Sequence, residues 1–326
     1  MNAWDAVVRI WLVVATWLGL GRAPRLARLA RIDHPTRFVR AAIGPAGGLL
    51  ALALAFLPRR RRNEAAITFL ACKALTGFDD ASGGWAGTCD GITGAVAYLS
   101  GEAHAPPRAV AEPPRTSDGL AALLAARLPL LRAALRRLPG DAVRRCCTII
   151  EQIGEGMILA RADRRCGVDY VFGEAVIAAA RLVAPAHRPP VFACEAAGLV
   201  LQLADQLRRA ESDSTREMLL YQALRELPTV PRLLRWLPAS VEAGTRAAAT
   251  LLAVATYRFY LQQIGARVPS GLRHSLRAVL AAGLTRRAYL GAVAAIEDGF
   301  RDALDALATR LDGRPATPLQ QASVLT

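Results

Sequence analysis

The chain consists largely of long runs of Ala, Leu and Arg that are divided by Pro and Gly. Ala, Leu and Arg are strong helix formers, whereas Pro ends a helix in which it would occupy an interior position. Breaks at Pro228, Pro231, Pro238, Pro269 and Gly283 separate runs that we expect to be helical. These runs are residues 120–138, 144–165, 169–182, 214–226, 238–265, 270–282 and 285–311. The pattern predicts an all-α protein, and 326 residues suffice for a sizeable core.

Two apolar runs carry acidic residues near their ends. Residues 69–80 end in Asp79 and Asp80, which share a helix face with Thr76. Residues 198–213 read as one helix, on which Asp205, Arg209 and Asp213 would fall on one stripe.

Two interpretations of this stripe remain open. It is either a solvated ladder of salt bridges or a carboxylate helix for metal and diphosphate. If the two acid-bearing helices faced each other across a cavity, their carboxylates would hold Mg²⁺, which prefers oxygen ligands.

These two runs resemble the squalene/phytoene synthase family. Residues 72–80 lie without a gap over the family's Leu-Arg-Ala-Leu-Asp-Thr-x-Glu-Asp. Residues 198–213 lie over its Gly-Leu-x-Leu-Gln-x-Thr-Asn-Ile-x-Arg-Asp-x-x-Glu-Asp. Weaker matches are Leu57-Pro58 with the arginines 59–62, the segment 153–157, and Asp169-Tyr170. The resemblance covers residues 45–300 and implies one helical bundle around a central apolar cavity.

The departures from the family motifs are specific. Thr76 replaces the first Asp of the first motif, and Arg209 replaces the first Asp of the second. Asp205 stands for an Asn and Ser212 for a Glu.

The resemblance implies roles for the residues that remain. We expect Asp79, Asp80, Asp205 and Asp213 to bind Mg²⁺, with Asp79, Asp80 and Asp213 the catalytic acids. The expected diphosphate ligands are Lys73, Arg208, Arg209 and Arg258, and the expected pocket residues are Thr76, Gly154, Met157 and Gln202. For Gly154 and its neighbour Gly156, close helix approach and room for a prenyl chain both remain open.

The resemblance implies a transferase that acts on prenyl diphosphates. Because the motifs keep about half of the usual acids, we favour one diphosphate in one weakened site. The prenyl group would then pass to a non-standard acceptor, such as an aromatic indole or carbazole. The alternatives are head-to-head coupling as in squalene or phytoene synthesis, a terpene cyclase or hydroxylating variant, and an inactive family member acting as a scaffold.

Other features constrain partners and location. The net charge is +14, but the positive charge is almost all Arg and is spread along the chain, so we do not expect nucleic-acid binding. Six cysteines without metal-ligand spacing read as small buried residues of a reduced, cytoplasmic compartment.

The two ends of the chain differ from the rest. The apolar run 3–21 is too short to span a bilayer, and two interpretations remain: a packing helix, or an interfacial helix giving peripheral membrane contact. We expect residues 1–312 to form one domain and residues 313–326 to be a disordered tail.

Overall fold

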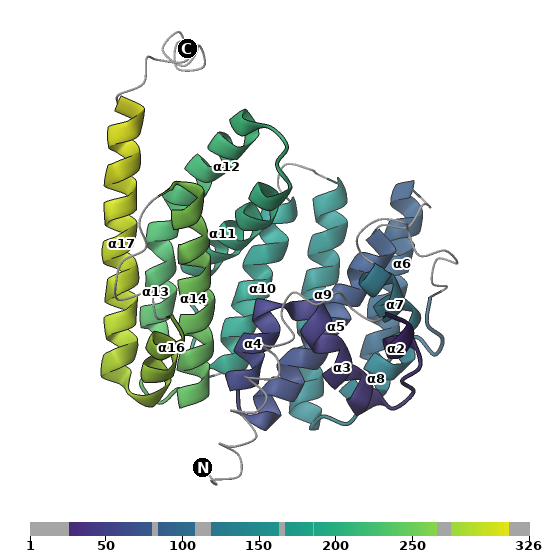
Figure 1. The fold of residues 1–326 in the computed structure, drawn as a ribbon. Helices are drawn as coiled ribbons and strands as arrows, with labels where there is room; N and C mark the ends of the chain where they lie inside the picture. The colour runs from purple at the N-terminus through teal and green to yellow at the C-terminus, as the bar shows by residue number, and fades with distance from the viewer. Residues whose placement is uncertain are drawn as a thin grey trace.

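The computed structural model describes residues 26–79, 84–107, 119–162, 167–184, 186–265 and 275–312, and all regular structure within them is helical (Figure 1). The predicted all-α class is therefore confirmed. The helices are α2 (Leu26–Ala30), α3 (Pro35–Gly47), α4 (Leu49–Phe56), α5 (Arg59–Asp79), α6 (Gly84–Ser100), α7 (Gly119–Ala126), α8 (Leu128–Leu135), α9 (Gly140–Ala162), α10 (Gly167–Val183), α11 (Val191–Arg209), α12 (Asp213–Glu226), η1 (Leu227–Thr229), α13 (Val230–Trp236), α14 (Ala243–Gln263), α16 (Ser275–Leu284) and α17 (Arg286–Asp312).

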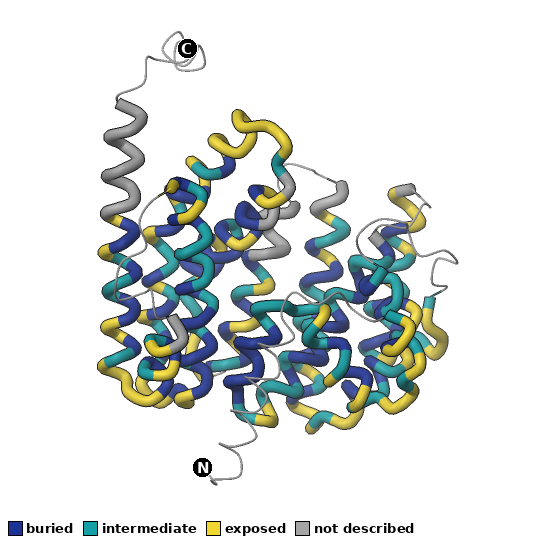
Figure 2. The backbone as a smooth tube through the Cα atoms, in the orientation of Figure 1, coloured by how far each residue is buried: buried dark blue, intermediate teal, exposed yellow. Residues whose placement is uncertain are grey.

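The helices bury their apolar faces in two main cores. The first core joins α3 to α9 and is closed on one side by residues of α14. The second core joins α11 to α14 with α16 and α17. Helix α10 packs between α9 and α11 and so connects the two halves (Figure 1). Buried residues follow the inner faces of these helices, while the turns and outer faces are exposed (Figure 2).

A buried carboxylate ties α5 to α9. Glu64 is completely buried, and the guanidinium of Arg145 donates a 2.9 Å hydrogen bond to it. Arg61 lies 3.6 Å from its other oxygen. A buried carboxylate needs such partners because burial removes its hydration. This ion pair fixes α5, the helix that carries the first acidic motif, against α9.

Proline and glycine divide the N-terminal half of the chain into short helices. The run 120–138 divides at Arg127 into α7 and α8, because Pro129 is tolerated only in the first turn of a helix. Gly48 separates α3 from α4, and its φ of 49° is a left-handed conformation that glycine adopts readily. The new axis of α4 directs its residues to the site described below.

The predicted N-terminal helix 3–21 and the tail 313–326 lie outside the described residues. Among the helices that are described, none is long and apolar enough to cross a membrane.

Candidate active site

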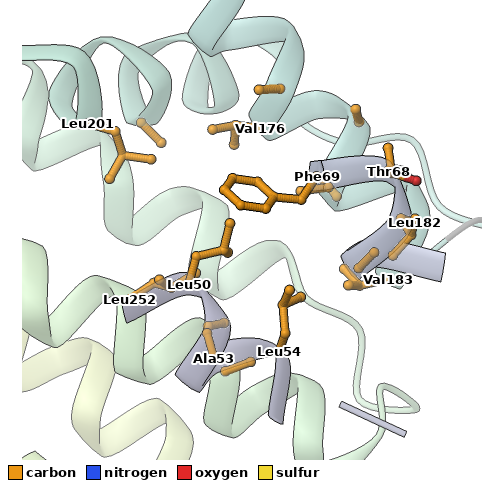
Figure 3. Close-up of a pocket in the computed structure, with 18 of the residues that line it drawn as sticks. Leu50, Ala53, Leu54, Thr68, Phe69, Val176, Leu182, Val183, Leu201 and Leu252 are labelled. Carbon is orange, nitrogen blue, oxygen red and sulfur yellow. The ribbon is translucent and has the colours of Figure 1, made fainter. Parts of the chain in front are cut away.

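A cavity of about 1130 Å³ lies between the two cores. Its wall is formed by residues of α4, α5, α9, α10, α11, α13 and α14, with Trp85 from α6. The ring of Phe69 projects into the space between Leu50 and Val176, with Leu201 and Leu252 beyond it (Figure 3). The central apolar cavity that the resemblance implied is therefore present.

Each helix presents one stripe of side chains to the cavity. The stripe of α5 consists of Ala65, Thr68, Phe69, Cys72, Lys73 and Thr76. That of α14 consists of Thr245, Ala248, Ala249, Leu252, Ala253 and Thr256. Steps of three and four residues return to the same helix face, so the sequence spacing explains which residues meet the cavity.

Two wall hydroxyls are bonded within their own helix. Thr68 donates a 2.9 Å hydrogen bond to the carbonyl of Glu64, and Thr76 donates a 2.8 Å bond to the carbonyl of Lys73. Such back-bonding satisfies the hydroxyls within the helix. The cavity wall is thereby less polar than its threonines suggest.

The C-terminal end of α5 reaches the exposed side of the cavity. Lys73 and Thr76 line it, and Trp85, at the start of the next helix, lines it while remaining 55% exposed. Asp79 is the last residue of α5, and its backbone position continues the stripe three residues beyond Thr76. The side chain of Asp79 and all of Asp80 lie outside the described residues.

The second motif is not one helix, so the expected continuous helix 198–213 is wrong. Helix α11 ends at Arg209, and α12 begins at Asp213. The physical reason is Ser212, whose hydroxyl accepts a 3.2 Å hydrogen bond from the backbone N–H of Thr215 and caps α12. Asp213 is exposed in the first turn of α12 and does not share a helical stripe with Asp205 and Arg209.

Helix α11 nevertheless brings its motif to the cavity. Val200 and Leu201 line it, and Leu201 is 41% exposed. Arg208 lies seven residues, two turns, beyond Leu201 on the same face. Its guanidinium carbon stands 5.0 Å from the ring centroid of Phe259 on α14. The side chains of Asp205 and Arg209 lie outside the described residues.

The predicted pocket residues divide into two groups. Thr76 and Met157 line the cavity. Gly154 instead lies where α9 meets α6, since a Cβ placed on it would stand 2.7 Å from Cγ2 of Val96. Gln202 is buried, its Oε1 has no hydrogen-bond partner, and it is not among the described residues of the wall.

Arg258, a predicted diphosphate ligand, is not among the described wall residues either. It follows Thr256 by two residues, a step that turns away from the stripe. The next stripe position is held by Phe259, a residue that sequence reasoning missed.

Asp213 alone among the four predicted metal ligands has a described side chain, and the described side chains contain no cluster of three His, Cys, Asp or Glu groups. Helix α5 ends at Asp79, three residues beyond the wall residue Thr76, and the role of Asp79 as a Mg²⁺ ligand stays a prediction.

The cavity wall also carries a thiol. Burial raises the pKa of Cys72 to about 12, and burial raises that of Cys146 to about 12. Both are free thiols that stay protonated at neutral pH; Cys146 is buried, as expected, whereas Cys72 is only partly buried because it faces the cavity.

Sequence reasoning missed Phe69 and Trp85, which line the cavity, and the contact of Phe259 with Arg208. Phe69 and Thr76 are seven residues apart, and Phe259 and Thr256 are three apart, so the helical period was available as a signal. However, the helical period does not say whether an apolar face lines a cavity or packs in a core, because that depends on helices distant in the sequence.

The comparisons show the fold. No protein-family model and no curated protein sequence matches this chain. The structure of squalene synthase from Trypanosoma cruzi, solved in complex with a ligand, E5700, is similar, with a TM-score of 0.58 and 13% sequence identity. The match covers 83% of this chain and 99% of that one. The chain therefore has the fold of squalene synthase, as the two motifs indicated.

Proposed function

We propose that this protein is a prenyltransferase that binds one allylic prenyl diphosphate and transfers the prenyl group to a second molecule, releasing diphosphate. The observation that carries the proposal is the apolar cavity, which residues of both motif helices line. Lys73 and Thr76 reach it from α5, and Leu201 reaches it from α11. The apolar prenyl chain would occupy the cavity, and its diphosphate would lie at the C-terminal ends of α5 and α11.

The chemistry requires that charge be stabilised on the leaving group. Ionisation breaks the allylic C–O bond and leaves the electron pair on diphosphate. Lys73 and Arg208, with Arg209, would contact that anion, because cationic donors bind phosphate strongly. Mg²⁺ held by Asp79 and Asp80, with Asp205 and Asp213 as further ligands, would supply additional charge neutralisation when bound.

The cavity wall would protect the carbocation. Aliphatic side chains exclude water, which would otherwise quench the cation. The ring of Phe69 projects into the space and offers a π face to a positive centre (Figure 3). The wall would therefore both exclude water and bind the cation weakly, as prenyl transfer requires.

One diphosphate site is the arrangement that we favour. The interruption of the second motif between Arg209 and Asp213 leaves fewer acids on α11 for a second cluster of metal ions. We therefore propose a separate acceptor, such as an electron-rich indole or carbazole.

Head-to-head coupling of two prenyl diphosphates is the second candidate, and one observation favours it. The cavity of about 1130 Å³ exceeds the roughly 300–1,000 Å³ typical of small-molecule pockets. The additional volume is what the chain of a second prenyl diphosphate would occupy.

Diphosphate release tests the proposal. The purified protein would be incubated with dimethylallyl, geranyl or farnesyl diphosphate, with and without Mg²⁺, alone and with indoles and carbazoles. Asp80→Asn is the test variant, and Asp90→Asn, the same change at an exposed position of α6, is the matched control.

Release that needs Mg²⁺ and an aromatic acceptor, and that Asp80→Asn alone abolishes, supports the proposal. A doubled-chain product from one substrate supports head-to-head coupling instead. No release and no diphosphate binding under any condition would favour an inactive protein with a scaffold role.

A further inference from the structure

An exposed arginine of α11 lies over an aromatic ring of α14. The guanidinium carbon of Arg208 lies 5.0 Å from the ring centroid of Phe259. Arg208 is exposed and Phe259 is half-buried. A cation–π contact of this kind at an exposed site is weak but favourable. It gives an otherwise flexible side chain a preferred position.

Arg208 and Phe259 lie beyond the last cavity-lining residues of α11 and α14, on the helix faces that line the cavity. On α11, Arg208 follows Leu201 by two turns, and on α14, Phe259 follows Thr256 by one turn. Both Leu201 and Thr256 line the cavity. Arg208 and Phe259 are not among the described wall residues themselves; the pair follows them toward the C-terminal ends of α11 and α14.

The two helices are held together beside the pair. Tyr260 donates a 2.5 Å hydrogen bond to the backbone carbonyl of Val200, and both residues are buried. The Tyr260 ring also meets the ring of Phe259 edge to face, with centroids 5.3 Å apart. The ring under Arg208 is thus itself fixed by its neighbours.

Stacking constrains a guanidinium without using its donors. The five N–H groups of arginine lie in the plane of the group, and a ring below that plane leaves them available. They match the oxygens of a phosphate in a bidentate geometry. A stacked arginine loses less side-chain entropy on binding an anion than a freely rotating one.

We propose that Phe259 is a positioning residue that holds Arg208 for the diphosphate of the substrate. This inference rests on the proposed function, because it takes the ligand of Arg208 to be a diphosphate. Phe259 touches the arginine and not the reacting atoms, so its effect appears in diphosphate affinity.

Titration calorimetry with inorganic pyrophosphate and Mg²⁺ tests the inference. Arg208→Ala should weaken binding by at least about tenfold, the loss expected for charge-assisted hydrogen bonds. Phe259→Leu keeps an apolar side chain but removes the ring, and should weaken binding by about two- to tenfold. Phe259→Tyr keeps the ring and should bind as the unaltered protein does.

A double variant separates positioning from general damage to the structure. In the Arg208→Ala protein, the added change Phe259→Leu should have no further effect on pyrophosphate binding. The matched control is Arg216→Ala, which removes an exposed arginine of α12 that donates to Gln263 at 3.4 Å. It should leave the affinity unchanged.

The outcomes distinguish the two levels of the argument. If Arg208→Ala weakens binding but Phe259→Leu does not, or if their effects add, the positioning role is refuted and the proposed function stands. If the unaltered protein does not bind pyrophosphate with Mg²⁺, the proposed function fails and this inference fails with it.

Discussion

The substitution Gly154→Ala distinguishes a packing role of this glycine from the pocket role that the sequence suggested. The added Cβ would stand 2.7 Å from Cγ2 of Val96, 3.5 Å from Ile92 and 3.6 Å from Leu75. A separation of 2.7 Å is too short for two carbon atoms, and the β-branched side chain of Val96 has little rotamer freedom with which to withdraw. Either α6 or α9 must therefore shift.

The magnitude follows from two opposing effects. Alanine gains about 1 kcal/mol over glycine in a helix interior. Overpacking of a close contact costs about 1–3 kcal/mol. The expected net change at Gly154 is a loss of about 0–2 kcal/mol in the free energy of unfolding.

A double-mutant cycle measured by urea denaturation provides the assay. When Val96→Ala removes the opposing methyl groups, Gly154→Ala should become stabilising by up to about 1 kcal/mol. The coupling between the two positions should then be at least about 1 kcal/mol. Equal effects of Gly154→Ala in both backgrounds would refute the packing argument. Unchanged stability with loss of prenyl diphosphate binding would restore the pocket role.

Three further predictions concern α5 and its neighbours. Phe69→Ala should shift the preferred substrate toward longer prenyl chains, because it removes the ring that projects into the cavity. Competition binding with prenyl diphosphates of 10, 15 and 20 carbons measures this preference, and an unchanged order would contradict the prediction. Glu64→Gln should lower the free energy of unfolding by about 1.5–3 kcal/mol, since it removes a buried charged hydrogen-bond acceptor. The exposed control Asp141→Asn should cost clearly less, because solvent screens its ion pairs. Guanidinium denaturation that ranks the two variants equally would refute the role of Glu64 as a buried acceptor. Burial raises the pKa of Cys72 and Cys146 to about 12. Both thiols therefore stay protonated in the folded protein, whereas they ionise in the unfolded chain above about pH 9. The free energy of unfolding should fall between about pH 9 and 11, by at most about 1.4 kcal/mol per pH unit for each thiol. Cys72→Ala should reduce this dependence on pH, as measured by urea denaturation, and an unchanged dependence would count against the raised pKa of Cys72.

The helical class and most helix positions could be predicted because they depend on local signals. The run 285–311 corresponds to α17 (Arg286–Asp312), and residues 169–182 correspond to α10 (Gly167–Val183). Two local signals that end or begin a helix were overlooked in the prediction, because the apolar residues around them recur with a helical period. Pro129 divided one expected helix, and the cap at Ser212 divided another.

The candidate site was predictable only where it coincided with a motif. Lys73 and Thr76, both residues of the first motif, line the cavity; the predicted contact of Lys73 with diphosphate stays a prediction. Gly154 contacts α6 instead, because the sequence of a helix does not say which neighbour each of its faces meets. The stacking of Phe259 on Arg208 joins residues of two helices, and no local pattern encodes it.

The central claim is that a prenyl chain occupies the cavity between the two cores with its diphosphate at the ends of α5 and α11. The most direct measurement is a crystal structure of the protein with Mg²⁺ and the non-ionising thio analogue of farnesyl diphosphate. The account predicts a chain that passes Phe69 and Leu252, with the diphosphate contacted by Lys73 and Arg208. A ligand bound elsewhere, or a chain that enters the cavity with its diphosphate remote from both motif helices, would contradict it.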